Sequence, residues 1–584
     1  MPAESPPISS RRRASGRMLG FALLAATILP QCSPPPAPPV DPADADRAET
    51  YLDPLREHLD HLLAVARDHY GEPSPAFVDG LEILTGEPVR WTYDSHTWIL
   101  SNLANQQDLL RTLDGMTAVT GEPRYRQAAI DAVAHHFRQQ RTGNGLFYWG
   151  GHTAIDAATG EWVGRRFHWL GKRRSPIHEL KSCFPHYDLM WRVDPDITAQ
   201  FIRSFWAAHI RDWSNLDFDR HGGVERPTPP GREVWDRPFD PAVPVFFQSQ
   251  GRTFVQTGSD LYYAAGMLYH LDSDRGALTW AHHLASRYIA TRDPSTGLRG
   301  YQYSNLETVD RAQEQFGDLF PNSHVSEAAI FDPNALTKPL LAQMSLSETL
   351  GKDGEQMRRW AIEDLLAIGR HAYDPAEGSM KSLLLDGSDL TGVKMPRDGY
   401  FGPAGTAFRS WPAEDYFLCY ATAARLDPDP LLWEMARNTG RHAGIGDIGA
   451  RDGTGVSLAP EPTSDAPAHL MALLELYRQT SRREYLDQAC RVGDRILKNR
   501  YEHRLFTPGP GYRFTRISRH EPLALLHLAA ALLGRPGDVP AFLDAHAYFA
   551  CELKSTDPDY TFDHEVIYTQ RRDATAPSAR PHVP

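Results

Sequence analysis

Cysteine is scarce in this sequence, and basic residues do not outnumber acidic ones. Five cysteines in 584 residues are too few and too widely spaced for a disulfide scaffold or a cluster of zinc thiolates. The 61 Lys and Arg residues against 74 Asp and Glu give a formal charge of −13. A nucleic-acid-binding protein needs clustered basic residues to neutralise phosphates, so this balance argues against a nucleic-acid partner.

A hydrophobic run long enough to span a membrane is also lacking at the start of the chain. The apolar run Met18–Leu29 is too short to cross a bilayer, but it follows Arg11–Arg13 and has the size of a signal-peptide core. Cys32 stands where a bacterial lipoprotein signal places its lipidated cysteine, and ordinary cleavage nearby is the alternative. We expect residues 1–45 to be a signal peptide and Pro-rich tether of an exported protein, either periplasmic or anchored through Cys32, with no transmembrane span.

A segment near the start of the remaining chain recurs near its end. Thr120–Ala129 and Thr480–Ala489 share Thr, Tyr and Ala at the same spacing. Each segment joins two stretches whose apolar residues recur at helical spacing, so the repeated unit is a helical hairpin. The same plan can be followed from seven positions: Leu109, Leu189, Leu261, Leu340, Tyr416, Leu470 and Leu523.

Successive amphipathic hairpins bury their apolar faces either by stacking into an open solenoid or by closing into a ring. The long, aromatic-rich connections and the uneven spacing of the units favour closure. We predict an all-α fold, an (α/α)7 toroid over residues 46–575 with short β-hairpins in its rim loops, followed by a disordered tail at 576–584. Ala48–Tyr70 is expected to be a further helix that completes or caps the ring, and six units are the alternative count.

In such a ring, every loop from an outer helix to the next inner helix lies on the same rim, so residues distant in sequence meet there. The richest rim stretch starts with Phe147–Trp162, an expected β-hairpin that carries His152. Glu179 is expected in the first turn of the next helix, after an N-cap at Ser175. His221 follows at the end of the second unit.

Each of these residues alone has an ordinary structural explanation. A glutamate in the first turn of a helix favours the helix dipole by roughly 0.3–1 kcal/mol, and the chain has 25 histidines. Together, His152, Glu179 and His221 suit a divalent transition ion such as Mn, Co, Ni, Zn or Fe and leave positions open for water and substrate. The set also matches a non-haem iron triad, although an all-helical toroid argues against oxygenase chemistry.

These motifs resemble those of the family 2 polysaccharide lyases, the metal-dependent pectate lyases. The similarity lies in Gly150–Thr153, His178–Lys181, Phe184–Tyr187, Arg220–Gly223 and Thr296–Tyr303. It covers most of the chain after the tether and extends to the seven-unit toroid. The tether itself is not a feature of that resemblance.

The resemblance implies that His152, Glu179 and His221 bind a metal ion, manganese first with cobalt or nickel as alternatives, and that Arg220 is the catalytic base. It also implies the reaction, a metal-assisted β-elimination of α-1,4-galacturonan that gives 4,5-unsaturated oligogalacturonides. Arginine is an unusual base because its guanidinium normally keeps its proton. From the residues alone, Arg220 could equally clamp a carboxylate.

An acidic polysaccharide needs local positive charge on a net acidic protein. Arg173 and Arg174 belong to a basic rim loop, Lys181 is part of the shared His-Glu-Leu-Lys motif, and Lys338 and Arg409 each precede an inner helix. We expect these five residues to contact polygalacturonate, with a solvated basic surface as the alternative. The protein is expected to act as a monomer.

Two other functions remain open from the sequence. A metal-independent hydrolase or lyase on an (α/α)6 toroid would use paired carboxylates or Tyr and His, and its activity would survive chelation. Its candidate acids are Asp260, Glu414, Asp415 and Asp447. A non-catalytic lipoprotein that captures pectic fragments would instead bind oligogalacturonate without converting it.

Overall fold

The structure is a computed structural model. It describes residues 41–93, 96–147, 153–164, 177–243, 252–300, 302–304, 329–330, 333–398, 403–544 and 567–572. All of these residues belong to one compact unit that begins at Val40. No helix within the described residues has both the length and the apolar character needed to cross a membrane.

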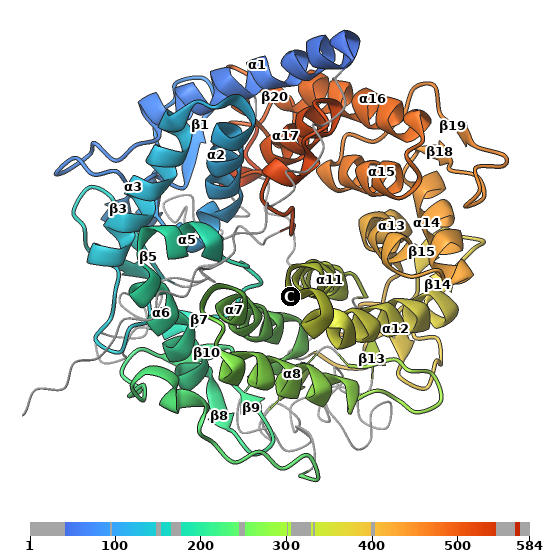
Figure 1. The fold of residues 1–584 in the computed structure, drawn as a ribbon, viewed down its shortest axis with the longest axis horizontal. Helices are drawn as coiled ribbons and strands as arrows, with labels where there is room; N and C mark the ends of the chain where they lie inside the picture. The colour runs from blue at the N-terminus through green and yellow to red at the C-terminus, as the bar shows by residue number, and fades with distance from the viewer. Residues whose placement is uncertain are drawn as a thin grey trace, which may run out of the picture. The chain divides into compact units, whose positions relative to one another are not determined.

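The helices pair along the chain as the sequence predicts, and within the described residues they form a ring of seven pairs (Figure 1). The inner helices are α2 (Gln107–Thr120), α5 (Tyr187–Val193), α7 (Val255–Asp272), α11 (Thr337–Leu350), α13 (Phe417–Leu426), α15 (Pro467–Thr480) and α17 (His520–Leu532). The outer helices are α3 (Pro123–Gln139), α6 (Pro195–His209), α8 (Arg275–Ile289), α12 (Glu355–His371), α14 (Pro430–His442), α16 (Arg483–Arg500) and α1 (Pro42–Val65). This arrangement confirms the predicted all-α toroid.

Helix α1 supplies the outer helix of the last pair and thereby closes the ring, because it packs on α17 at the other end of the helical chain. The Tyr51 hydroxyl donates to the Cys490 carbonyl at 2.9 Å, which also ties α1 to α16. The predicted tether is wrong in its last four residues. Asp41 accepts a hydrogen bond from the Ala43 amide, and Pro42 occupies the first helical position, so the helix begins before residue 46.

The two repeated segments adopt the same inner-to-outer turn. Gly121 and Ser481 end α2 and α15 in the left-handed conformation, with φ of 79° and 56°. Tyr125 and Tyr485, which have equivalent positions in the two segments, are both fully buried at the start of the following helix. The shared sequence therefore encodes a helix end and an anchor for the next helix.

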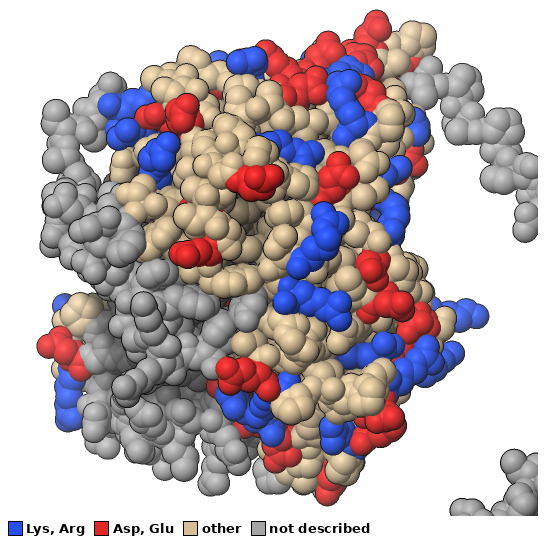
Figure 2. All heavy atoms as spheres, turned by 90° about the vertical axis from the view of Figure 1, so that its left-hand side faces the viewer, with Lys and Arg blue, Asp and Glu red and all other residues tan. Residues whose placement is uncertain are grey.

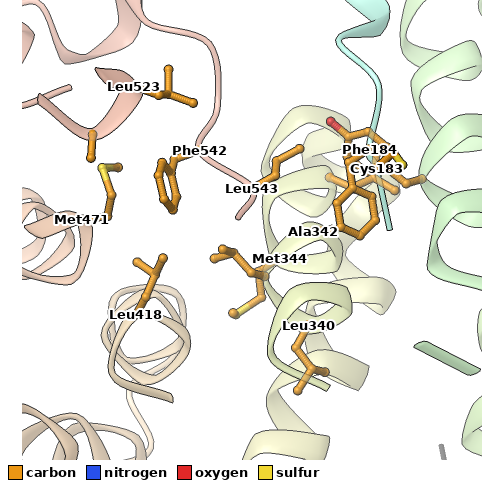
Figure 3. Close-up of a cluster of buried hydrophobic side chains, with 14 of the residues drawn as sticks. Cys183, Phe184, Leu340, Ala342, Met344, Leu418, Met471, Leu523, Phe542 and Leu543 are labelled. Atoms are coloured by element: carbon orange, nitrogen blue, oxygen red, sulfur yellow. The ribbon is translucent and has the colours of Figure 1, made fainter. Parts of the chain in front are cut away.

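A segment near the C-terminus fills space between the inner helices. Val539–Asp544 follows α17, and Phe542 and Leu543 are buried among side chains of α11, α13, α15 and α17 (Figure 3). The His527 ring of α17 contacts the Pro540 carbonyl at 3.0 Å. Apolar side chains from this segment thus complete the core that the inner helices enclose.

Leu543→Ala tests that contribution. We expect it to lower the free energy of unfolding by roughly 2–5 kcal/mol, because the side chain is completely buried and its removal leaves a cavity. The matched control is Leu84→Ala, since Leu84 is 57% exposed, and its effect should stay within about 0.5 kcal/mol. Urea denaturation followed by circular dichroism measures both, and equal effects would mean that the segment contributes little to the core.

Short antiparallel ribbons occupy the loops. They are β1 (Gly80–Glu82) with β22 (Phe514–Arg516), β2 (Trp91–Tyr93) with β3 (His96–Trp98), β4 (Leu100–Ser101) with β5 (Thr153–Asp156) and β6 (Trp162–Gly164), β7 (Ile177–Glu179) with β10 (His221–Gly223), β8 (Ile210–Asp212) with β9 (Asp217–Phe218), β11 (Arg252–Phe254) with β12 (Gln302–Ser304), β13 (Ala329–Ile330) with β16 (Leu383–Leu384), β14 (Tyr373–Asp374) with β15 (Ser379–Met380) and β17 (Trp411–Pro412), β18 (Gly446–Asp447) with β19 (Ser457–Leu458), and β20 (Tyr501–Glu502) with β21 (Leu505–Phe506). The pairing of β5 with β6 confirms a β-hairpin in the first rim loop.

Candidate active site

The ribbon formed by β7 and β10 places two of the predicted metal ligands opposite each other. Glu179 pairs with His221, and His178 pairs with Gly222. Side chains alternate across a strand, so Glu179 and His221 share one face of the ribbon, whereas His178 points to the other. Atom Oε1 of Glu179 lies 3.5 Å from Nε2 of His221, and Glu179 is only 2% exposed.

Glu179 is not in a helix, and this expectation from the sequence is wrong. Residues 177–179 form a strand because the Gly222-Gly223 strand pairs with them, and helix α5 begins only at Tyr187. Between them, Ser182 and Phe184 have positive φ angles of 54° and 40°, which a helix cannot accommodate. The ribbon thus brings the carboxylate directly against the imidazole.

The other face of the ribbon rests on α6 through two buried histidines. Nδ1 of His178 lies 2.8 Å from Nε2 of His209, and Nδ1 of His209 lies 2.7 Å from the Asp219 carbonyl. A carbonyl only accepts, so His209 donates to it and in turn accepts from His178. Burial lowers the pKa of His209 to about 4 and also lowers the pKa of His178, so both rings are neutral near pH 7.

Gly222 is required beneath this histidine pair. A Cβ atom at Gly222 would lie 2.5 Å from Nε2 of His209, whereas a Cβ atom at Gly223 would meet nothing within 4 Å. We therefore expect Gly222→Ala to lower the free energy of unfolding by roughly 1–3 kcal/mol, because the hydrogen-bonded ring of His209 must move. Gly223→Ala on the same strand is the control and should change it by less than about 0.5 kcal/mol. Urea titration compares the two, and indistinguishable midpoints would contradict the expectation.

Two basic side chains face the same carboxylate. Nζ of Lys181 lies 3.2 Å and Nε of Arg220 lies 3.9 Å from Oε1 of Glu179. The Lys181 side chain is 9% exposed and that of Arg220 17%. Glu179 is thus surrounded by nitrogen atoms of His221 in β10, of Arg220 just before that strand, and of Lys181, two residues after the end of β7.

Glu179 and His221 have the chemistry of a divalent metal site. Donor atoms 3.5 Å apart can both reach one ion, since metal-ligand distances are roughly 2.0–2.2 Å. Among the residues that the structure describes, no group of three or more His, Cys, Asp or Glu side chains is arranged to hold an ion. The third predicted ligand, His152, lies outside the described residues.

The predicted substrate contacts lie in different places. Lys181 is in the site, and Lys338 at the start of α11 lies 3.5 Å from Asp544. The exposed Arg409 lies with its guanidinium 4.2 Å from the centre of the Trp411 ring. Arg173 and Arg174 lie outside the described residues.

Asp260 and Asp447, two candidate acids of the metal-independent alternative, already have partners within the protein. Asp260 accepts hydrogen bonds from the Lys181 and Ser182 amides, which lower its pKa, but burial has the larger effect and raises the pKa to about 7. Asp447 pairs with Arg437 and Arg441 of α14, and these contacts lower its pKa. The role of Asp260 was missed from the sequence, because its partners are backbone amides about eighty residues away that leave no pattern.

Known proteins are similar to this chain over most of its length. A family described as periplasmic pectate lyase matches residues 74–552. The pectate disaccharide-lyase of Dickeya dadantii (strain 3937) is 30% identical over 553 residues, which cover 90% of this chain and 97% of that protein. Similar solved structures include a D-mannose isomerase, with 11% identity, a TM-score of 0.43 and coverage of 74% of this chain and 98% of that one. The cellobiose 2-epimerase from Spirochaeta thermophila DSM 6192 has 13% identity, a TM-score of 0.43 and coverage of 75% and 98%. Because the family match and the close relative both span most of the sequence, the chain belongs to the family of periplasmic pectate lyases.

Proposed function

We propose that this chain cleaves α-1,4-polygalacturonate at the β7–β10 ribbon and releases 4,5-unsaturated oligogalacturonides. The observation that carries the proposal is the pairing of Glu179 with His221, with Lys181 and Arg220 at the same carboxylate. The family of the chain supplies the substrate class.

The reaction determines what the site must provide. A base takes the proton from C5, the electron pair forms the C4–C5 double bond, and the bond from C4 to the glycosidic oxygen breaks. The departing oxygen receives a proton from water. Negative charge builds up on the C6 carboxylate during proton removal, so the site needs positive charge at that carboxylate.

Glu179 and His221 would hold a divalent transition ion together with His152, and manganese is the first candidate, with cobalt or nickel as alternatives. When bound, the ion supplies a Lewis acid for the C6 carboxylate. The backbone pairing of β7 with β10 fixes both side chains in advance. Lys181 balances the charge of the buried Glu179 and would attract the carboxylate of the substrate.

Arg220 is our candidate for the base that removes the C5 proton. It precedes His221, and its carbonyl accepts from the Leu180 amide at 2.9 Å, which extends the ribbon and holds the backbone in place. Its guanidinium must be neutral to accept a proton. A dication held at His221 would place positive charge beside this guanidinium, opposite the Glu179 carboxylate at 3.9 Å.

The remaining contacts would come from basic residues on the rim. We assign Arg173, Arg174, Lys338 and Arg409 to carboxylates of neighbouring sugars, in addition to Lys181. Basic and acidic side chains are interspersed over the described part of the side shown in Figure 2, so the net negative charge does not form one repelling surface there.

One assay tests the function and its rivals. The protein is incubated with polygalacturonate with and without a chelator, and the ultraviolet absorbance of the unsaturated product is followed. We expect product that chelation abolishes and added manganese restores. Activity that survives exhaustive chelation would support the metal-free enzyme, and binding without product would support the fragment-capturing lipoprotein.

We also propose that the exported protein is anchored by a lipid on Cys32 and is a monomer. Export agrees with the periplasmic description of the family. Intact-mass analysis of the membrane fraction should find an acylated chain that begins at Cys32, and a soluble chain that begins elsewhere would exclude the anchor. Light scattering of the protein after release from the membrane should give the molar mass of a single chain.

A further inference from the structure

The turn that follows Glu179 has an unusual backbone. Ser182 and Phe184 both adopt left-handed conformations, with φ of 54° and 40°. Side chains other than glycine rarely adopt such angles, and two so close together persist only where the surroundings hold them. The turn at residues 181–184 is therefore held in place by its neighbours.

A buried carboxylate on α7 holds one side of this turn. Oδ2 of Asp260 accepts hydrogen bonds from the amides of Lys181 at 2.9 Å and Ser182 at 2.7 Å. Oδ1 lies 3.5 Å from the Phe184 amide. Successive amides in a backbone of alternating handedness form a concave site for acceptor oxygens, and here these oxygens are those of the Asp260 side chain. Asp260 is 4% exposed, so water does not replace these bonds.

Helix α2 holds the other side. The Arg111 guanidinium donates to the Phe184 carbonyl, and the Gln107 side chain accepts from the His186 amide at 2.8 Å. The turn is thus fixed between two inner helices of the ring. The contacts with helices α2 and α7 therefore set the position of the turn relative to the β7–β10 ribbon.

The turn determines where Lys181 points. Residues two apart in an extended strand lie on the same side, so Lys181 follows Glu179 on the face that carries His221, while Leu180 is buried on the opposite side. The resulting distance between Nζ of Lys181 and Oε1 of Glu179 is 3.2 Å. If the turn relaxed, the ammonium group would leave this face.

We propose that Asp260 is a positioning residue of the lyase, which holds the 181–184 turn and thereby keeps the ammonium of Lys181 beside Glu179 and the substrate carboxylate. The proposal rests on the proposed function of the β7–β10 ribbon. Asp260 acts here through Lys181 and does not itself touch the substrate.

Asp260→Asn and Lys181→Met, alone and combined, test this coupling. Each single variant should lower kcat/KM for polygalacturonate by roughly 10–100-fold, the usual scale for residues that orient the binding groups of a site without touching the substrate. The double variant should be little worse than either single one, because both changes remove the same ammonium from the site. Multiplied effects in the double variant would overturn the proposal.

Cys183 provides a readout without substrate or metal. It lies buried within the turn, as Cys419 and Cys490 lie buried elsewhere. Asp260→Asn should raise the alkylation rate of Cys183 at least several-fold, whereas the rates of Cys419 and Cys490 stay unchanged, as peptide mass mapping would measure. Equal exposure of all three thiols would indicate general loosening of the fold and would overturn the positioning role.

The control variant is Asp194→Ala. Asp194 also accepts a backbone hydrogen bond, from Ile197 at 2.9 Å, but it caps α6 at the turn between α5 and α6. It should lower the melting temperature without changing kcat/KM or the Cys183 rate. Should Asp260→Asn not fold, Asp260→Glu takes its place: it keeps the carboxyl group but shifts the two oxygens, and it is judged by the same outcomes. If the wild-type protein forms no unsaturated product, the proposed function is rejected. If the wild type is active but the effects of Asp260→Asn and Lys181→Met multiply in the double variant, only the role of Asp260 is rejected.

Discussion

Arg220→Lys should lower kcat for polygalacturonate by roughly 10²–10⁴, the usual scale of acid-base catalysis, while KM and bound metal change little. Lysine keeps a positive charge but loses the planar guanidinium that reaches to 3.9 Å from Glu179. The proton acceptor would therefore be displaced from C5, whereas the groups that bind metal and sugar remain. Initial rates of unsaturated product over a range of substrate concentrations, with metal saturating, give both constants.

Arg203→Lys is the matched control for this experiment. Arg203 of α6 pairs with Asp272 at 2.9 Å and with Asp274 at 2.8 Å, at the turn between α7 and α8, so the kinetic constants of this variant should match those of the wild type. If Arg220 only clamps a carboxylate equally well before and during the reaction, Arg220→Lys will raise KM and leave kcat nearly unchanged. That result would remove Arg220 from the role of base.

Loss of a single metal ligand should have an effect of similar size. We expect His152→Ala, Glu179→Gln and His221→Ala each to lose most of the bound divalent ion and to lower kcat by at least about 10²-fold, because the charge on the C6 carboxylate is then poorly stabilised. Circular dichroism should stay close to that of the wild type, since Glu179 and His221 lie in a short ribbon and the helix pairs carry the core. Elemental analysis of the purified variants measures the metal per chain.

His503→Ala is the control for these variants, because His503 is an exposed histidine between β20 and β21. It should keep the full metal content. The three ligands are judged separately: a variant that retains one ion per chain removes that residue from the site. His152→Ala is the most informative of them, since this residue alone tests whether the first rim loop contributes a ligand.

Much of the ring could be predicted from local sequence. The spacing of apolar residues marked the inner helices, and the shared segment around Tyr125 and Tyr485 marked the turn between helices, because a helical hairpin is encoded within a few tens of residues. Closure by α1 was anticipated only as an alternative, since the pairing of Tyr51 with Cys490 joins residues at opposite ends of the helical chain. The start of α1 was misplaced, although Asp41-Pro42 is a recognisable helix start.

The identity of the site residues also came from the sequence, through the motifs around Glu179, Arg220 and His221. Their arrangement did not. Glu179 follows a plausible helix start, yet the pairing of β7 with Gly222-Gly223 makes it part of a strand, and pairing between strands some forty residues apart cannot be judged from either strand alone. The carboxylate of Asp260 likewise meets its amides only when α7 packs behind the turn. Local periodicity determined the helices, and short motifs determined which chemical groups the site contains. The relative positions of its charged groups depend on long-range packing and were decided by the tertiary structure.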